Sequence, residues 1–285
     1  MCFFVKRKQH KRKSDVIFSK KGVNILDIIT SRNNNLVIET AKLKDRKQRE
    51  KMRTFLFEGI KLTREAIMQG VEITHIFLTE KCAEKYPDLA DRKEAVVISD
   101  SVCEKLSENN APEGIICTAR YLDNLHKEYT AADTIDLKDS CLILSTIQDP
   151  GNLGTIARTS AAFGKKTLIL SSDCADIYNQ KTIRASMGAM FRTTTYRTSD
   201  LCKTINDIRK RGQEVYATAL TEKALPLSSV KNPKNSCFVM GNEGHGLSDE
   251  VIYSCTGTVI IPMEKDAESL NVSSAASVIL WEAYR

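Results

Sequence analysis

Three segments of the sequence combine glycines and short polar side chains directly after an apolar run. They span residues 147–164, 238–251 and 260–277. We expect each apolar run to form a buried strand, so that the polar residues follow its carboxyl end. In open α/β sheets, ligands bind in the crevice beyond the carboxyl ends of the strands. The three segments therefore predict one shared crevice in which chemistry takes place.

The first segment, IQDPGNLGTIARTSAAFG, carries an amide and a guanidinium at helical spacing. We predict that Asn152 caps the helix after the turn and that Arg158 lies under two turns further along it. Both side chains would then line the same mouth. A guanidinium suits orientation and charge stabilisation there, because its pKa above about 12 makes it a poor base. The alternative interpretation is a simple cap and a surface arginine.

The second segment, FVMGNEGHGLSDEV, has three glycines within six positions. Glycine lets the backbone approach a ligand or another segment closely. No GK[ST] follows, so the pattern is not that of a phosphate-binding loop. His245 stands alone in this glycine turn, and we interpret it as exposed and without a catalytic role.

The third segment, IIPMEKDAESLNVSSAAS, leads into the last helix that the sequence predicts. Glu268, Ser269 and Asn271 each suit a helix N-terminus, as caps or as partners of the helix dipole. The apolar residues from Val272 onward recur at helical spacing, which predicts a buried face. The first turns contain only small side chains. Such a slim helix start allows another segment to approach the backbone closely.

Strands and helices alternate along the chain, which indicates an α/β architecture in two domains. Over residues 28–121, predicted strands and helices alternate with the spacing of a small α/β domain, beginning with a charged helix over 39–54. Residues 122–140 show mixed polarity and no sustained period, so we predict a linker there. The alternation resumes over 141–285 as a second α/β domain. We expect residues 1–27 to form a basic, flexible N-terminal segment.

The charge of the chain is unevenly distributed. The first 60 residues contain sixteen Lys and Arg against six Asp and Glu, whereas the remainder contains 26 against 30. A basic N-terminal part indicates a polyanionic partner, nucleic acid above all. The alternative is a solubilising tail.

Cysteine usage and hydropathy bound the setting of the protein. The nine cysteines include no CxxC pair, so they indicate neither a disulfide framework nor a zinc site. We therefore expect a reducing, cytoplasmic environment. No apolar run approaches the roughly 20 residues of a membrane span. The sequence accordingly predicts no membrane partner and no metal.

The three segments, in this order, resemble the signature motifs of the SpoU/TrmH RNA ribose methyltransferases of the SPOUT class. KTIRASMGAMFR, residues 181–192, resembles the segment that these proteins place between the first and second motifs. The resemblance covers nearly all of residues 141–285, and residues 29–67 are similar to the family's N-terminal domain. It implies an α/β trefoil-knot domain preceded by a small L30e/L7Ae-like α/β domain. The small residues of the last helix suit packing beside a threaded chain.

The resemblance also implies a cofactor, S-adenosyl-L-methionine, and a role for individual residues. It implies cofactor binding by Gly241, Ile261 and Leu270, with a lesser contribution from residues 218–220. It implies that catalysis involves Arg158 together with Asn152, Glu243, Ser269 and Asn271, and that RNA is contacted by Arg184 and Lys181. An alternative for Arg184 is a structural cation at a helix start. Whether Arg158 deprotonates the hydroxyl or only orients it stays open.

The leading hypothesis is a methyltransferase that acts on the ribose 2′-hydroxyl of structured RNA. A 23S-type ribosomal RNA is the favoured substrate and transfer RNA the alternative, because the same architecture serves both. Family members are usually homodimers, which the resemblance implies here too. A second hypothesis is a catalytically silent RNA-binding protein of ribosome assembly. A third, a doubly wound nucleotide-binding domain, is disfavoured by the missing phosphate loop.

Overall fold

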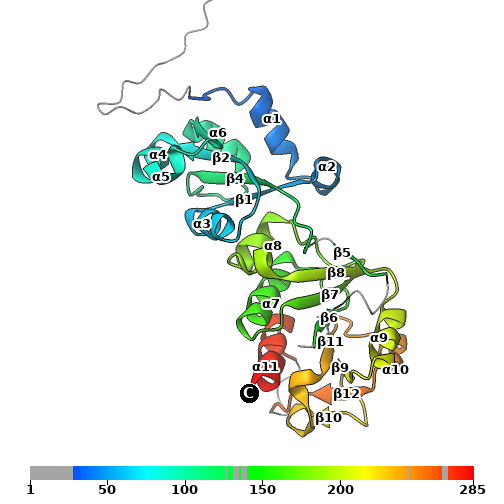
Figure 1. Cartoon of the computed structure of the whole chain (residues 1–285). Helices are drawn as coiled ribbons and strands as arrows, with labels where there is room; N and C mark the ends of the chain where they lie inside the picture. Colours follow the sequence, from blue (N-terminus) through cyan, green and yellow to red (C-terminus); the bar gives the residue numbers. More distant parts are fainter. Residues whose placement is uncertain (1–27, 126, 131–134, 136–139, 243, 265–268) are drawn as a thin grey trace, which may run out of the picture.

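Two α/β units, each built around its own sheet, lie one above the other (Figure 1). The structure is a computed structural model that describes residues 28–125, 127–130, 135, 140–242, 244–264 and 269–285. The N-terminal segment predicted over residues 1–27 and the candidate Glu243 lie outside these residues. None of the helices in the described part of the chain is long and apolar enough to cross a membrane.

The first unit contains a sheet with the order β1-β4-β2-β3. Its strands are β1 (Thr54–Glu58), β2 (Ile73–Thr79), β3 (Ala95–Ile98) and β4 (Ile115–Arg120). Its helices are α1 (Asn35–Lys42), α2 (Arg46–Met52), α3 (Ile60–Met68), α4 (Glu80–Lys85), α5 (Pro87–Ala90) and α6 (Asp100–Leu106). Strand β4 is antiparallel to β1 and β2, whereas β2 and β3 are parallel. Every residue of β1 is buried.

The single helix predicted over residues 39–54 is divided in two in the structure. Helix α1 ends at Lys42, and the Asp45 side chain caps α2 by accepting a hydrogen bond of 3.1 Å from the Gln48 amide. Asp favours a cap over a helix interior because its carboxylate satisfies an otherwise unpaired amide. The sequence-based prediction of one continuous helix was therefore wrong, because Asp45 caps a separate second helix.

The second unit contains a larger sheet with the order β10-β12-β9-β11-β6-β7-β8-β5. Its strands are β5 (Lys127–Glu128), β6 (Leu142–Leu144), β7 (Thr167–Ser171), β8 (Thr194–Thr198), β9 (Val215–Thr218), β10 (Leu225–Pro226), β11 (Cys237–Met240) and β12 (Gly257–Ile260). All of its strand pairs within the described residues are parallel. Strand β5 lies within the linker predicted over 122–140 and pairs with β8.

Helices cover both faces of the larger sheet, which explains why its central strands are apolar throughout. Those of the second unit are α7 (Pro150–Ala162), α8 (Gln180–Ala185), α9 (Leu201–Lys210), α10 (Asp249–Ser254) and α11 (Val272–Tyr284), with short 3₁₀ turns at Ala189–Arg192, Leu227–Ser229 and Pro233–Asn235. Helices α7 and α11 lie on one side of the sheet, and α9 and α10 lie on the other (Figure 1). The helix predicted from residue 272 onward is confirmed.

Helices α7 and α8 approach each other closely at Gly154. A Cβ atom on this residue would lie 2.3 Å from the Thr182 carbonyl oxygen and 2.7 Å from the Ala185 Cβ. Both distances are far below van der Waals contact, so only glycine permits this packing. The glycine of the first segment thus sets the distance between two helices.

The two units are joined by a buried ion pair and a cluster of aromatic rings. The Arg49 guanidinium lies 2.6 Å from an Asp176 carboxylate oxygen, and only 4% and 15% of these side chains are exposed. Arg49 also donates to the carbonyl oxygens of residues 43 and 44. The Tyr121 and Tyr178 rings stack with centroids 3.8 Å apart, and Phe55 packs on Tyr178. One hydrophobic core therefore runs from the first unit into the second.

The knot implied by the resemblance depends on how the chain passes from β12 to α11. Residues 265–268, which lie in this passage, are outside the described residues. The knot therefore stays a prediction.

Removing the charge of Asp176 should destabilise the junction between the units. Asp176→Asn leaves the buried Arg49 guanidinium without its counter-ion, and breaking a buried pair in this way costs about 3–5 kcal/mol. Urea unfolding would measure the loss. The matched control is Glu50→Gln, which breaks an exposed pair with Arg46 and should cost less than about 1 kcal/mol. Equal losses in the two variants would contradict the structural role of the buried pair.

Gly154→Ala should destabilise the protein although alanine is the better helix former. The added methyl group would push α7 away from α8, and such overpacking costs about 1–3 kcal/mol. Thermal unfolding would detect it. In the control Gly257→Ala, the new methyl group meets only Tyr216 at an ordinary 3.7 Å, so stability should change by less than about 0.5 kcal/mol. A stabilising Gly154→Ala substitution would refute the proposed close contact.

Candidate functional site

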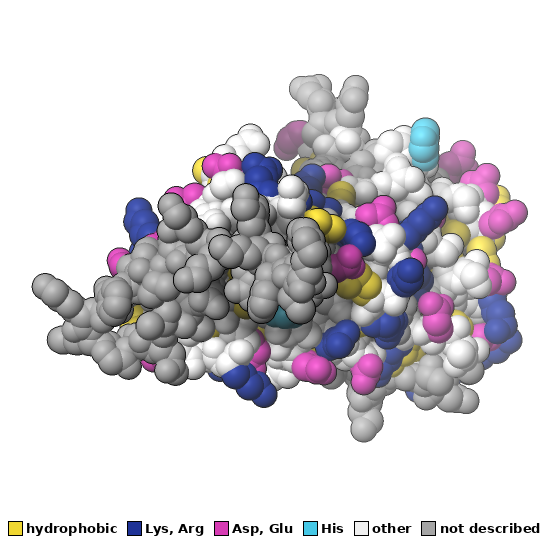
Figure 2. Space-filling model, turned by 90° about the horizontal axis from the view of Figure 1, so that it is seen from above, with side chains coloured by type: hydrophobic (Ala, Val, Ile, Leu, Met, Phe, Trp, Pro, Cys, Tyr) yellow, Lys and Arg dark blue, Asp and Glu magenta, His cyan; other side chains and the backbone are white. Residues whose placement is uncertain are grey.

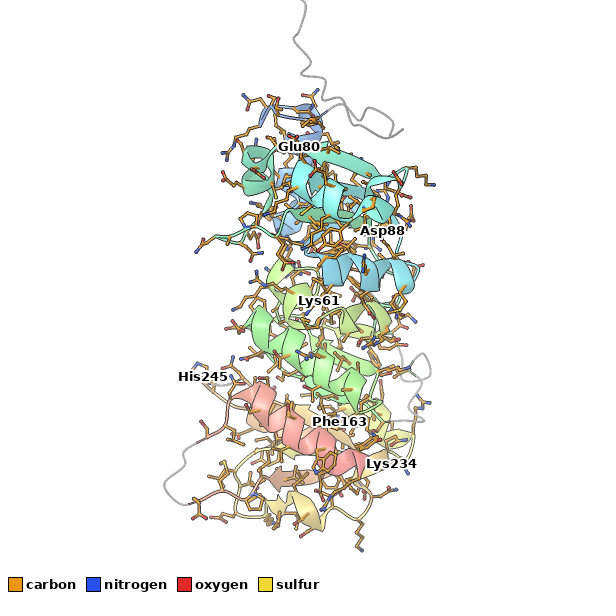
Figure 3. All side chains as sticks on the ribbon, turned by 90° about the vertical axis from the view of Figure 1, so that its left-hand side faces the viewer. Lys61, Glu80, Asp88, Phe163, Lys234 and His245 are labelled. Carbon is orange, nitrogen blue, oxygen red and sulfur yellow. The ribbon has the colours of Figure 1, made fainter. Side chains whose placement is uncertain are left out.

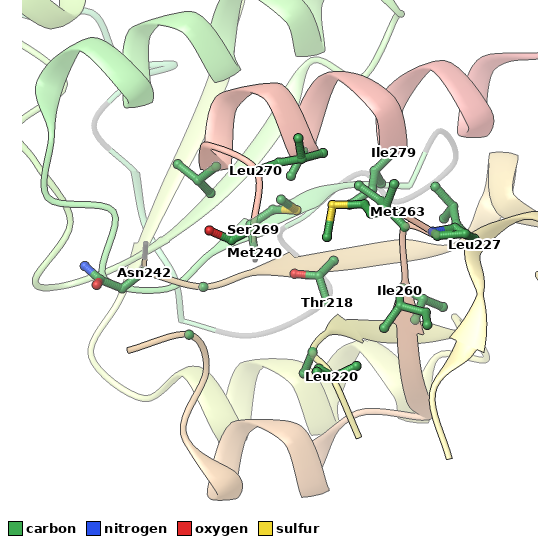
Figure 4. A pocket seen from close by; sticks show the side chains of 18 of the residues that line it. Thr218, Leu220, Leu227, Met240, Asn242, Ile260, Met263, Ser269, Leu270 and Ile279 are labelled. Carbon is green, nitrogen blue, oxygen red and sulfur yellow. The ribbon is translucent and has the colours of Figure 1, made fainter. Parts of the chain in front are cut away.

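A cavity of about 650 Å³ lies beyond the carboxyl ends of β9, β11 and β12 (Figure 4). Its walls include residues 218–220, 240–242, 259–264 and 269–270. These residues belong to the second and third segments and to the end of β9. The sequence-based prediction that polar strand ends converge is thus confirmed for two of the three segments. The cavity lies where ligands bind in open parallel sheets.

The glycine turn of the second segment forms one wall of the cavity. The Asn242 and Gly246 backbones exchange hydrogen bonds of 3.1 and 2.9 Å, which closes the turn. A Cβ atom on Gly241 would lie 2.5 Å from the Gly246 carbonyl carbon, so the turn closes only because residue 241 is glycine. His245 is exposed in this turn, as we interpreted it from the sequence.

The third segment contributes a second wall, together with α11. Ser269 and Leu270 line the cavity, and Ile279 of α11 forms part of its apolar surface (Figure 4). Asn271 is the cap of α11, with its Oδ1 accepting a hydrogen bond of 2.9 Å from the Ser273 amide. Its Nδ2 donates across to Asn152 Oδ1 at 3.2 Å. Asn271 therefore joins the third segment to the first.

The first segment adjoins the cavity but contributes no lining residue within the described part of the chain. Asp149, and not Asn152, caps α7: its Oδ1 accepts a hydrogen bond of 2.8 Å from the Asn152 amide. The helix begins three residues earlier than predicted, because Pro150 is well suited to its first position. Asn152 is consequently already helical, which frees its side chain to meet Asn271.

The basic candidates lie outside the cavity. Arg158 is exposed on α7 and makes no hydrogen bond or ion pair with any other described residue. Arg184 is exposed on α8. Lys181 pairs with Asp149 at 2.6 Å, and its ammonium group holds the pKa of that carboxyl below the ordinary value. Neither Asn152 nor Arg158 lines the cavity, so the mouth that we expect them to share stays a prediction. Of the two, only Asn152 contacts a segment that lines the cavity.

The structure gathers the predicted cofactor residues Gly241, Ile261 and Leu270 around the same cavity. Sequence reasoning missed Asn242, which lines the cavity beside them. Its position directly after a buried strand, between two glycines of the second segment, was the available signal. Among the described residues, no group of three His, Cys, Asp or Glu side chains is placed to hold a metal ion.

Two family models match the chain, and they divide it in the same way as the two sheets. The SpoU rRNA Methylase family matches residues 139–281, and the MRM3-like substrate binding domain matches residues 34–117. The first match contains the cavity and all three segments. The second contains the complete first sheet apart from the end of β4.

Proteins of known sequence and structure resemble this chain over nearly its whole length. An uncharacterized tRNA/rRNA methyltransferase of Synechocystis is 32% identical over 90% of this chain and 93% of its own. The Bacillus subtilis 23S rRNA guanosine 2′-O-methyltransferase RlmP is 28% identical over 89% and 97%. The AdoMet-bound rRNA methyltransferase of Sinorhizobium meliloti is 26% identical, with a TM-score of 0.76 over 90% and 96% of the two chains. The protein is thus a member of the SpoU rRNA methylase family.

Proposed function

We propose that this protein transfers a methyl group from S-adenosyl-L-methionine to a ribose 2′-hydroxyl of structured RNA. The observation that carries the proposal is the cavity bounded by the closed glycine turn and Leu270, with the Asn152–Asn271 contact beside it. Relatives named as RNA 2′-O-methyltransferases support the reaction type, and an AdoMet-bound relative of the same fold supports the cofactor.

The cavity suits S-adenosyl-L-methionine in size and chemistry. A volume of about 650 Å³ lies within the roughly 300–1,000 Å³ of small-molecule sites. Apolar side chains such as Ile261 and Leu270 suit an adenine ring, and backbone groups at residues 240–242 suit its polar edge. Glu264 also lines the cavity, and its carboxylate matches a cationic ligand in charge. The residues present therefore fit the cofactor.

When bound, the cofactor supplies an activated methyl group on a cationic sulfur. Attack by the ribose oxygen on this carbon would form the new bond, break the carbon–sulfur bond and leave a neutral thioether. The chain must hold the ribose oxygen in line and stabilise its negative charge as its proton passes to solvent. We assign orientation of the ribose to Asn152, Ser269 and Asn271, and charge stabilisation to Arg158. We assign Glu243 to the same group of residues because it lies in the second segment.

The permanent positive charge and exposed position of Arg158 support its role. A guanidinium without a partner among the described residues is available to an alkoxide or to the neighbouring phosphate. Arg158 lies six residues beyond Asn152, about 9 Å along the helix axis, so RNA bound over α7 would lie between them.

Ribosomal RNA is the favoured substrate, with transfer RNA as the alternative. The Bacillus subtilis relative is named for 23S rRNA, and the Synechocystis relative for either class. We assign RNA contacts to Arg184 and Lys181 on α8 and to the first unit, whose family model is a substrate binding domain. Viewed from the end of the first unit, Lys and Arg side chains are interspersed with Asp and Glu (Figure 2). Recognition of folded RNA is therefore not a matter of charge alone.

We also propose that two copies of the chain associate through α11. Val278, Trp281 and Tyr284 are 40%, 53% and 57% exposed on this helix. Phe163 at the end of α7 packs against the last two rings and lies beside the C-terminal half of α11 (Figure 3). Exposed aromatic clusters of this kind are typical of the centre of a protein interface.

We place an RNA-binding domain at 28–121, a linker at 122–140 and the methyltransferase domain at 141–285, preceded by a basic segment at 1–27. We propose a trefoil knot in the methyltransferase domain and a cytoplasmic setting. The small side chains at the start of α11 support the knot. The buried cysteines, which form no disulfide within the described part of the chain, support the cytoplasmic setting.

Incubation of the protein with methyl-labelled cofactor and total RNA should label ribose 2′-oxygens, and ribosomal RNA most strongly. Mapping the labelled nucleotides would separate ribosomal from transfer RNA. An intact protein that binds RNA but labels none would contradict the proposed enzyme and favour a silent RNA-binding protein.

Arg158→Ala should lower kcat by about 10²-fold or more, because loss of a charge-stabilising donor costs this much. The dissociation constant of the cofactor should stay nearly unchanged by calorimetry, since Arg158 does not line the cavity. Arg209→Ala is the matched control: Arg209 is exposed on α9, across the sheet from α7, and bonds only to the Ser254 carbonyl among the described residues. Normal turnover by Arg158→Ala would refute the assigned role.

Val278→Asp should convert the proposed dimer to a monomer, because it buries a charge in an apolar interface. Sedimentation would measure the mass, and the emission of Trp281, the single tryptophan, should shift to longer wavelength on exposure. The control Tyr253→Asp changes an 83% exposed residue on α10, across the sheet, and should leave the mass unaltered. A wild-type protein that sediments as a monomer at all concentrations would overturn the proposal.

A further inference from the structure

Thr146, the second residue after the end of β6, has a left-handed backbone with φ of +57°. This conformation is a genuine outlier for a β-branched residue. Such strain persists only where the surrounding structure imposes it, and it concentrates at functional sites. Thr146 precedes the loop of residues 147–149, which leads into α7 and thereby positions Asn152. The contacts of Thr146 therefore bear on the geometry of the first segment.

The two neighbouring strands of β6 hold Thr146 from both sides. On the β7 side, the Thr146 amide donates to Ser171 Oγ at 2.9 Å, and its hydroxyl donates to Asp173 Oδ2 at 2.8 Å. Burial raises the pKa of Asp173, but hydrogen bonds from Ser171 and Thr146 outweigh it and leave the pKa lowered. On the β11 side, the Thr146 carbonyl oxygen accepts a hydrogen bond of 2.9 Å from Asn242 Nδ2.

The Asn242 side chain has a different task at each end. Its Oδ1 accepts hydrogen bonds from the amides of Gly244 at 2.8 Å and His245 at 3.3 Å, which stabilises the turn on the cavity wall. Its Nδ2 reaches the first segment instead, at Thr146. An amide can do both, whereas a carboxylate accepts but does not donate. Asn242 therefore ties the cavity wall to the loop before α7.

We propose that Asn242, acting through Thr146, is a positioning residue for methyl transfer. Its hydrogen bond sets the start of α7, and with it Asn152 and Arg158, relative to the cofactor in the cavity. This inference rests on the proposed function. The geometry supports it because Asn152 meets the third segment and Thr146 meets the second. The first segment contributes no wall of its own, and these two hydrogen bonds join its start to the segments that line the cavity.

Asn242→Asp tests the tie while it preserves the shape of the side chain. The carboxylate still accepts from the turn amides but loses the donor to Thr146. We expect kcat to fall at least about tenfold, toward the 10²-fold that a misplacement of about 1 Å costs. The KM for RNA should change by less than about threefold, because the lost interaction acts on the transition state and not on RNA binding.

Asn124→Asp is the matched control. It removes an equivalent half-buried hydrogen bond, from Asn124 Nδ2 to the Thr193 carbonyl oxygen at 2.7 Å, at a position away from the cavity. Both variants should lose similar thermal stability, but only Asn242→Asp should lose kcat. Equal kcat values in the two variants would overturn the inference and leave Asn242 a structural residue of the turn.

Thr146→Gly separates positioning from stability. Glycine adopts the left-handed conformation without strain, but it also lets the backbone at residue 146 adopt other conformations. We expect a lower kcat with little change in the melting temperature, because relief of strain offsets the lost hydroxyl bond. A Thr146→Gly variant with wild-type kcat would count against a positioning role.

Hydrogen exchange distinguishes failure of this inference from failure of the proposed function. Added S-adenosyl-L-methionine should protect the amides of residues 146–153 in the wild type, and Asn242→Asp should abolish this protection. The measurement does not require turnover. Absence of methyl transfer by the wild type would refute the proposed function alone, whereas unchanged protection in Asn242→Asp would refute the tie between cavity and helix.

Discussion

The arrangement of the site depends on side-chain amides that join loops which the sheet itself leaves unconnected. Parallel strands end at one edge of the sheet, and the backbone ladder ends with them. Beyond that edge, Asn242 reaches from the second segment to Thr146, and Asn271 reaches from the third to Asn152. Each amide also caps or closes its own loop. The amide side chain suits this task because it donates and accepts at once.

Glycine supports this arrangement by allowing contacts that leave no space for a side chain. At Gly241 the turn of the second segment closes on itself, and at Gly154 the first segment packs against α8. Both are backbone-to-backbone approaches. Neither glycine has a positive φ, so space and not conformational freedom explains the residue type. The same physical requirement thus appears in the turn after β11 and in the first half of α7.

Contacts at the junction between the two units position helix α8, which carries the proposed RNA contacts. Asp176, the partner of Arg49, lies in the loop that leads to α8, and Tyr178 in the same loop stacks on Tyr121. The Tyr178 hydroxyl also bonds to the amide and carbonyl of Leu122, where the chain leaves the first unit. Helix α8, with Arg184, is therefore positioned by contacts from both sheets. A substrate held by the first unit would meet α8 in a defined orientation.

The sequence by itself determined the alternation of strands and helices, the two-unit organisation and the three segments, because periodicity and glycine placement are local properties. It also indicated that Gly241, Ile261 and Leu270 belong together, through the resemblance and not through spacing. It misplaced the cap of α7, since Asp149 and Asn152 are both good capping residues, and it merged α1 with α2 although Asp45 stood between them.

Only the tertiary structure decided which distant groups meet. The hydrogen bonds of Asn242 and Asn271 span 96 and 119 residues, and the pairing of Arg49 with Asp176 spans 127. No periodicity encodes such contacts, because they depend on the order in which strands enter the sheet. The strained backbone of Thr146 is of the same kind: threonine does not favour that conformation, and only neighbours from two other strands impose it.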